Sequence, residues 1–143
     1  MFISEYTYNL DDKRRLAIPA KFRKLLTRKA VITKGLDNCL WLFPEKEWSA
    51  LAEKIGKLPI SQADARGFSR VMLAGATEVV IDSLGRILIP DHLKEHARLD
   101  KKTVIAGIDK RIEIWDEARW KAYQKQTASE LDDMAERLKE LGI

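Results

Sequence analysis

Two Asp–Arg pairs with the same spacing carry the clearest chemistry in this sequence. Asp11 lies four residues before Arg15, and Asp82 lies four residues before Arg86. Each Arg is followed by an apolar residue, one variable residue, Ile and Pro. Asp and Gly favour tight turns, so the two ends of each motif should approach and pair. The planar fork of arginine binds phosphate oxygens or a guanine edge. The motif predicts either an ion pair that fixes a turn or a held arginine that also faces an anionic partner.

Basic residues concentrate in the first part of the chain. The net charge is +4, but residues 1–43 hold nine Lys or Arg and four Asp or Glu, a net of +5, whereas residues 44–143 hold 17 and 18, a net of −1. Eight basic residues and no acidic one lie between Lys13 and Lys29. This asymmetry is typical of a chain with an anionic partner, nucleic acid being the first candidate, although a solvated face has the same composition.

The first turn is more basic than the second. Lys13 and Arg14 lie at its tip, where the second turn has Leu84 and Gly85, so the first turn should dominate any shared affinity. A basic helix is predicted to follow, in which Lys21, Lys24 and Arg28 lie on one side at 3–4 spacing. It contains Lys21, Arg23, Lys24, Arg28 and Lys29. The side chains predicted to contact nucleic acid are Arg15, Arg86, Lys13, Arg14, Lys21 and Lys24.

An internal repeat organises the chain. Asp11–Pro19 returns as Asp82–Pro90, 71 residues later, and Gly35–Phe43 returns as Gly107–Trp115, 72 residues later. Each copy predicts a strand, a tight turn, a strand that ends at Pro, a short helix and a hairpin. A copy of about 40 residues is marginal alone, so the two should share one core in an α+β fold. The expected organisation is repeat 1 over 5–47, connecting helices over 48–75, repeat 2 over 76–119 and a C-terminal helix over 120–143.

Apolar spacing predicts the buried faces of these elements. The second strand of each copy alternates with period two, and each short helix has one apolar side. The predicted core positions are Leu16, Ile18, Phe22, Leu25 and Leu26 in the first copy and Ile87, Ile89, Leu93 and Ala97 in the second.

The remaining segments are predicted to be helical. One helix should run from Trp48 to Leu58, and Ser61 should cap another that reaches Leu73. Residues 117–141 should form a long helix with an apolar stripe at 3–4 spacing. We expect this stripe to pack on the protein's own core, with pairing to another subunit as the alternative.

Other chemistry-bearing residues give weak indications. His92 and His96 share a helix face, as metal ligands would, but no third ligand is evident. Cys39 has no His partner nearby and is expected to fill the core. The four Trp residues should serve the core or an interface. With no phosphate-binding glycine loop and no G-x-S-x-G, we expect no enzyme, cofactor or small-molecule substrate.

Composition excludes further classes. Hydrophobic residues make up 45% and charged residues 34% of the chain, as in globular domains. No apolar run approaches the roughly 20 residues that span a bilayer, and the start lacks a signal-peptide pattern. The single Cys39 excludes an internal disulfide framework, so a reducing, cytoplasmic setting is expected.

The doubled motif resembles the MraZ family of bacterial transcriptional regulators. The resemblance rests on Asp11–Pro19, Asp82–Pro90, the opening residues 1–11 and Ile112–Trp115, and extends over nearly the whole chain. It implies a SpoVT-AbrB-like swapped-hairpin β-barrel with flanking helices. It also implies a ring-shaped homo-oligomer that binds short direct repeats of double-stranded DNA ahead of the cell-division and cell-wall gene cluster containing its own gene.

The resemblance also assigns the motif residues. Asp11, Arg15, Asp82 and Arg86 take the motif positions, Arg15 being the chief DNA contact, and the protein should be nucleoid-associated. Family members usually carry Gly before the first motif Arg, where this chain has Arg14, which leaves the geometry of that turn open. The alternative function is an oligomeric protein-interaction scaffold.

Overall fold

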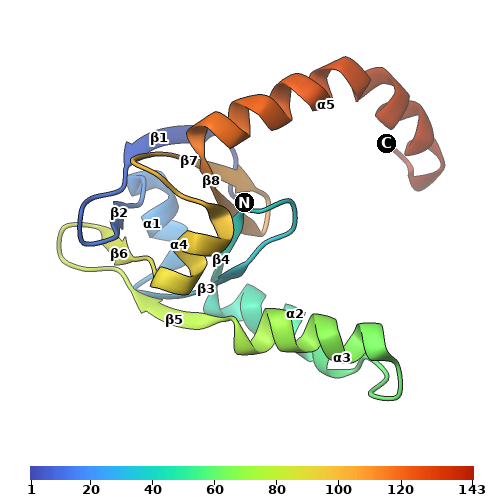
Figure 1. Cartoon of the computed structure of the whole chain (residues 1–143), viewed down its shortest axis with the longest axis horizontal. Helices are drawn as coiled ribbons and strands as arrows, with labels where there is room; N and C mark the ends of the chain where they lie inside the picture. The colour runs from blue at the N-terminus through green and yellow to red at the C-terminus, as the bar shows by residue number, and fades with distance from the viewer.

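The same run of elements occurs twice along the chain (Figure 1). The computed structural model describes residues 1–143. The first half contains β1 (Glu5–Asn9), β2 (Arg15–Ala17), α1 (Ala20–Leu26), β3 (Lys29–Lys34) and β4 (Leu40–Pro44). The second half contains β5 (Thr77–Val80), β6 (Arg86–Leu88), α4 (Asp91–Ala97), β7 (Lys102–Ile108) and β8 (Arg111–Asp116). The predicted α+β class and the order strand, strand, helix, strand, strand are confirmed.

Each half gives its first strand to the other half. The six-stranded sheet has the order β1-β7-β8-β4-β3-β5, so β1 pairs with β7 and β5 pairs with β3. The β4–β8 pair joins the halves at the centre, and every pairing is antiparallel. The two second strands, β2 and β6, form a separate antiparallel pair, here called the β2–β6 ribbon. This exchange is the swapped-hairpin arrangement that the family resemblance implied.

One apolar cluster of 19 buried residues holds both halves together. It includes Leu16 and Ile18 from the first half and Ile87 and Ile89 from the second, each at most 1% exposed. Because neighbouring side chains of a strand point to opposite faces, the same alternation that buries these residues sends those between them outward. The predicted core positions are buried, except that Leu25 is exposed on α1.

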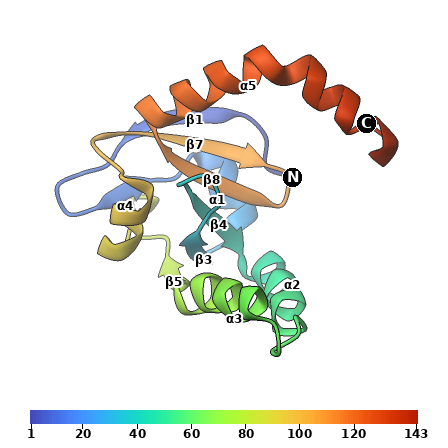
Figure 2. The same ribbon diagram turned by 45° about the vertical axis from the view of Figure 1, so that its right-hand side comes forward.

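Two helices between the halves form a lobe on one side of the sheet (Figure 2). They are α2 (Glu45–Gly56) and α3 (Ala63–Ser69), the latter continuing as a π-helical turn, Arg70–Ala74. The prediction that Ser61 caps the second helix was wrong. That helix begins after Gln62 without a side-chain cap, because a turn closed by the Gln62 N–H and the Pro59 carbonyl at 3.1 Å takes in Ser61.

The C-terminal helix α5 (Glu117–Arg137) lies on the side away from this lobe (Figures 1 and 2). Trp120 and Tyr123 pack on Trp115, with ring centroids 5.3 and 5.1 Å away. Further on, Leu131 is 61% exposed and Leu141 is 77% exposed, and α5 contains no buried residue. The expectation that its whole apolar stripe packs on the protein's own core was therefore wrong beyond the first turns. No helix of the chain combines the length and apolarity that crossing a membrane requires.

Candidate nucleic-acid interface

The β2–β6 ribbon brings the two motif arginines onto one surface. Its register pairs Arg15 with Leu88, and Ala17 with Arg86, around the central Leu16–Ile87 pair. Leu16 and Ile87 are buried in the core, so the alternating side chains on either side of them face outward. Arg15 and Arg86 therefore project from the same outer face although they are 71 residues apart in sequence.

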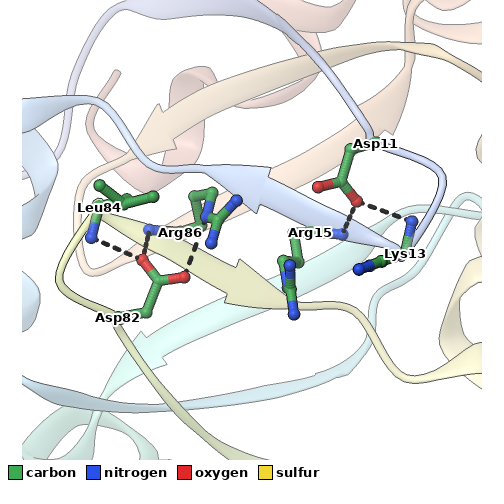
Figure 3. A network of polar contacts seen from close by, with 6 residues as sticks. All are labelled: Asp11, Lys13, Arg15, Asp82, Leu84 and Arg86. Carbon is green, nitrogen blue, oxygen red and sulfur yellow. Dashed lines mark hydrogen bonds and ion pairs between the residues drawn. The ribbon is translucent and has the colours of Figure 1, made fainter.

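Each motif aspartate organises the turn that leads into its arginine (Figure 3). The backbone N–H groups of Lys13 and Arg15 donate to Asp11 Oδ1 at 2.9 and 2.7 Å. In the second turn, the backbone N–H groups of Leu84 and Arg86 donate to Asp82 Oδ1, both at 2.9 Å. Asp side chains commonly mimic a backbone turn in this way.

These backbone donors also favour the charged forms of the two aspartates. The backbone hydrogen bond from Arg15 is the main cause that holds the pKa of Asp11 below its ordinary value of 3.8. The backbone hydrogen bond from Arg86 does the same for the pKa of Asp82, and the guanidinium of Arg86 adds to it. Hydrogen bonds to a carboxylate lower its pKa because the protonated form accepts them less well.

The predicted ion pair forms in only one of the two motifs. Arg86 Nε donates to Asp82 Oδ2 at 2.9 Å. Arg15 makes no such contact with Asp11, because its side chain turns away from the carboxylate (Figure 3). The expectation of an Asp11–Arg15 ion pair was therefore wrong, since that carboxylate receives only backbone donors. The guanidinium of Arg15 belongs to none of the chain's four ion pairs.

Arg14 adopts the same left-handed backbone conformation as Gly85, its counterpart in the second turn. Its φ is 61°, and that of Gly85 is 78°. The hydrogen bond from the Arg14 N–H to the Asp11 carbonyl, 3.0 Å, matches the 2.9 Å bond from Gly85 to Asp82. The absence of Gly therefore leaves the backbone of the first turn unchanged.

Two different arginines hold equivalent strand ends. Arg14 Nε donates to the Ile89 carbonyl oxygen at 3.0 Å, and Arg23 Nη1, from α1, donates to the Ile18 carbonyl oxygen at 2.7 Å. The guanidinium of Arg23 occupies the space into which a Cβ at Gly85 would project. Arg23 thus places the basic helix α1 beside the less basic second turn.

The remaining basic candidates lie outside the two strands of the ribbon. Lys13 is exposed in the first turn, and Lys21 and Lys24 are exposed on α1. The predicted alignment of Arg28 with these lysines was wrong, because α1 ends at Leu26. Thr27 follows with a φ of 61°, so Arg28 lies outside the helix.

The other sequence candidates take structural positions. His92 Nε2 lies 3.3 Å from the Gly75 carbonyl oxygen, and His96 Nε2 lies 3.3 Å from that of Gly35. Cys39 is buried, and burial raises the pKa of its thiol. The His96 contact joins the second-half helix α4 to the first half. Burial of Cys39 keeps its thiol protonated.

Sequence reasoning missed a buried carboxylate at the centre of the sheet. Glu113 accepts hydrogen bonds from Trp41 Nε1 at 2.9 Å, Trp115 Nε1 at 3.1 Å and Arg111 Nη2 at 2.9 Å. The Arg111 guanidinium also lies 4.7 Å from the centroid of the Trp41 ring. An acidic residue between the apolar residues Ile112 and Ile114, two residues before Trp115, was the available indication.

Comparison with known proteins agrees with both halves of this architecture. The MraZ family model, described as "MraZ protein, putative antitoxin-like", matches residues 1–71 and again residues 72–141. A relative from Moorella thermoacetica named "Transcriptional regulator MraZ" is 47% identical over 143 residues, which cover the whole of both chains. Relatives with the same name from Desulforamulus reducens and Natranaerobius thermophilus are 44% identical over 99% of each chain and 45% identical over all of each chain, respectively. The chain belongs to the MraZ family.

Proposed function

We propose that this protein is a sequence-specific DNA-binding transcriptional regulator that contacts DNA through the outer face of the β2–β6 ribbon. The observation that carries the proposal is the placement of Arg15 and Arg86, one from each half, on that one face. Arginine is the side chain that most often contacts guanine specifically, through O6 and N7. The names of the relatives, all transcriptional regulators, support a function other than catalysis.

The ribbon has suitable dimensions for the major groove. Two paired strands lie about 4.7–4.9 Å apart, so the ribbon is narrower than the groove, which is about 12 Å wide. Two-stranded ribbons enter this groove in known DNA-binding folds. In this arrangement Arg15 and Arg86 reach base edges, Arg15 being the dominant contact because Asp82 occupies one edge of the Arg86 guanidinium.

The surrounding positive charge then contacts the DNA backbone. Lys13 at the first turn and Lys21 and Lys24 on α1 bind phosphates, and the remaining donors of Arg14 add charge beside Arg15. Asp11 and Asp82 hold the turns and make no DNA contact. Phosphate contacts of this kind position a protein on the duplex without reading its sequence.

The DNA target and the oligomeric state that we propose follow the family resemblance. The protein binds short direct repeats upstream of the cell-division and cell-wall gene cluster that includes its own gene, acting as a ring-shaped homo-oligomer at the nucleoid. Each subunit's ribbon is small, so a single contact is weak. Linked subunits that occupy successive repeats raise the effective concentration and hence the affinity.

Binding to the DNA upstream of its own gene tests this proposal. Gel-shift titrations of wild type and Arg15→Ala should show specific binding by the wild type and its loss in the variant. Arg137→Ala, which removes the same charge from α5, serves as the matched control and should bind like wild type. Circular dichroism and light scattering should show an unchanged fold and subunit count for both variants.

The exposed apolar residues of α5 favour a second candidate, a protein-interaction scaffold. Leu131 on α5 and Leu141 in the short 3₁₀ turn that follows it, Lys139–Leu141, face solvent, as expected for a surface that meets another protein. A scaffold predicts that Arg15→Ala has no effect and that function is insensitive to salt. Unchanged binding of Arg15→Ala to the promoter DNA would contradict the regulator proposal.

A further inference from the structure

The outer face of the β2–β6 ribbon carries apolar side chains between its arginines. Across the ribbon, Leu88 lies opposite Arg15, and Ala17 lies opposite Arg86. The four outward positions therefore alternate, with the two arginines on one diagonal and the two apolar residues on the other. This arrangement places an apolar side chain beside each guanidinium.

The hydrogen-bond pattern brings these neighbours close. The Ile89 N–H donates to the Arg14 carbonyl at 2.8 Å, and the Ile18 N–H donates to the Gly85 carbonyl at 2.9 Å. Hydrogen-bonded and non-hydrogen-bonded pairs alternate along an antiparallel ladder, so Arg15–Leu88 is a non-hydrogen-bonded pair. Side chains of such pairs approach most closely, with Cβ atoms about 4.5–5.5 Å apart.

Leu88 is exposed where its strand neighbours are buried. It is 50% exposed, whereas Ile87 and Ile89 on either side are at most 1% exposed. The core therefore does not account for a large apolar residue at this position. A duplex against the ribbon would cover Leu88 at the same time as Arg15.

We infer that Leu88, supported by Ala17, recognises the C5-methyl group of a thymine adjacent to the base that Arg15 contacts. This methyl group is the apolar feature of the major-groove edge, and apolar side chains recognise it by contact. The inference rests on the proposed function, because it assigns a specificity-determining residue to the same DNA-binding face. Arg15 then reads hydrogen-bond acceptors while Leu88 reads a methyl group beside them.

Replacing thymine by deoxyuridine tests the inference without changing the protein. Full-length wild type is titrated with duplexes of the DNA upstream of its own gene. In each duplex, one thymine of a single direct repeat is replaced by deoxyuridine. One position should lose about fourfold in affinity, which corresponds to the burial of roughly one carbon group. Leu88→Ala should bind the thymine and deoxyuridine duplexes equally.

Leu84→Ala is the matched control, because Leu84 is also exposed but lies at the tip of the second turn, outside the ribbon register. It should retain the wild-type preference for thymine. If the wild type binds specifically but with the same affinity to the thymine duplex and to every deoxyuridine duplex, the role of Leu88 is overturned and the proposed function stands. A preference for thymine that persists in Leu88→Ala would also overturn that role. Absence of specific binding by the wild type would overturn the proposed function, and the inference with it.

Discussion

Arg14 donates from Nε to the carbonyl oxygen of Ile89 at 3.0 Å, and this bond ties the first turn to the strand end of the other half. The equivalent carbonyl of Ile18 receives Arg23 from α1. Arg23 can reach it because Gly85 has no side chain in the way. The two halves thus satisfy the same carbonyl by different routes, one from the turn and one from the helix. The first turn thus supplies from its own Arg14 the donor that the second turn receives from α1.

Substitutions at Arg14 and Lys94 should have non-additive effects on the free energy of unfolding. Lys94 occupies the place in α4 that Arg23 occupies in α1, 71 residues earlier. In wild type, Lys94→Arg should change the free energy of unfolding by less than about 0.5 kcal/mol, because Arg14 already satisfies the Ile89 carbonyl. In an Arg14→Gly background the same substitution should stabilise by about 1 kcal/mol, the contribution of a hydrogen bond. Urea unfolding of the wild type, the two single variants and the double variant, all at one protein concentration, measures this double-mutant cycle. Strictly additive free energies would refute the prediction.

Gly85→Ala should destabilise the protein by about 1–3 kcal/mol. The residue has a φ of 78°, which costs a residue with a side chain about 1–2 kcal/mol, and its new Cβ would displace Arg23. Arg23→Ala should remove part of this cost when combined with it, because the collision disappears. Gly67→Ala is the control, since nothing lies within 4 Å of a Cβ added there. Thermal and urea unfolding would report the differences, and equal stability of the Gly85→Ala and Gly67→Ala variants would argue against the collision.

The order of the elements could be predicted because each copy of the repeat contains residues that mark where its strands end. Alternation of apolar residues around Leu16 and Ile87, followed by Pro19 and Pro90, defines strands that end at short helices. The exchange of first strands could not be read from these residues, because alternation shows which face is buried but not which strand is adjacent. It entered only through the family resemblance.

Side-chain partners were less predictable than turns. Identical spacing suggested identical ion pairs, yet Asp82 binds a guanidinium and Asp11 does not. In both turns backbone N–H groups donate to the Oδ1 of the aspartate, so the spacing of the motif determines the turn but not the partner of the arginine side chain. The α5 stripe shows the same limit, since 3–4 spacing predicts an apolar side without showing what covers Leu131.

Glu113→Ala should destabilise the protein by about 3 kcal/mol. The substitution leaves the Arg111 guanidinium and the indole N–H groups of Trp41 and Trp115 without their acceptor in a mostly buried site. Tryptophan fluorescence should also change, since two of the four indoles contact this carboxylate. Glu130→Ala, exposed on α5, is the control and should unfold like wild type. A loss below about 0.5 kcal/mol would show that this buried network contributes little to stability.

The two motif aspartates should stabilise their turns only while ionised. Each has a pKa below its ordinary value of 3.8 in the folded protein, so its contribution is present above that value and is lost as the pH falls through the lowered pKa. Carboxyl-detected NMR should show Asp11 and Asp82 titrating below 3.8. Asp82→Asn should flatten the fall in stability as the pH drops below 3.8. Titration of either carboxyl above its ordinary value would contradict the backbone hydrogen bonds described for its turn.

Salt dependence should separate the phosphate contacts from the base contacts. If Lys13 and Lys24 each bind a phosphate, replacing either by Ala should lower affinity for all sequences and reduce the slope of log affinity against log salt by about one. Arg15→Ala should instead reduce the ratio of specific to non-specific affinity, because base contacts carry the sequence information. Lys125→Ala, which removes a charge from α5, should leave both quantities unchanged. Fluorescence anisotropy on promoter and scrambled duplexes at several salt concentrations measures both, and a lysine variant that changed only the specificity ratio would place that lysine on a base edge instead.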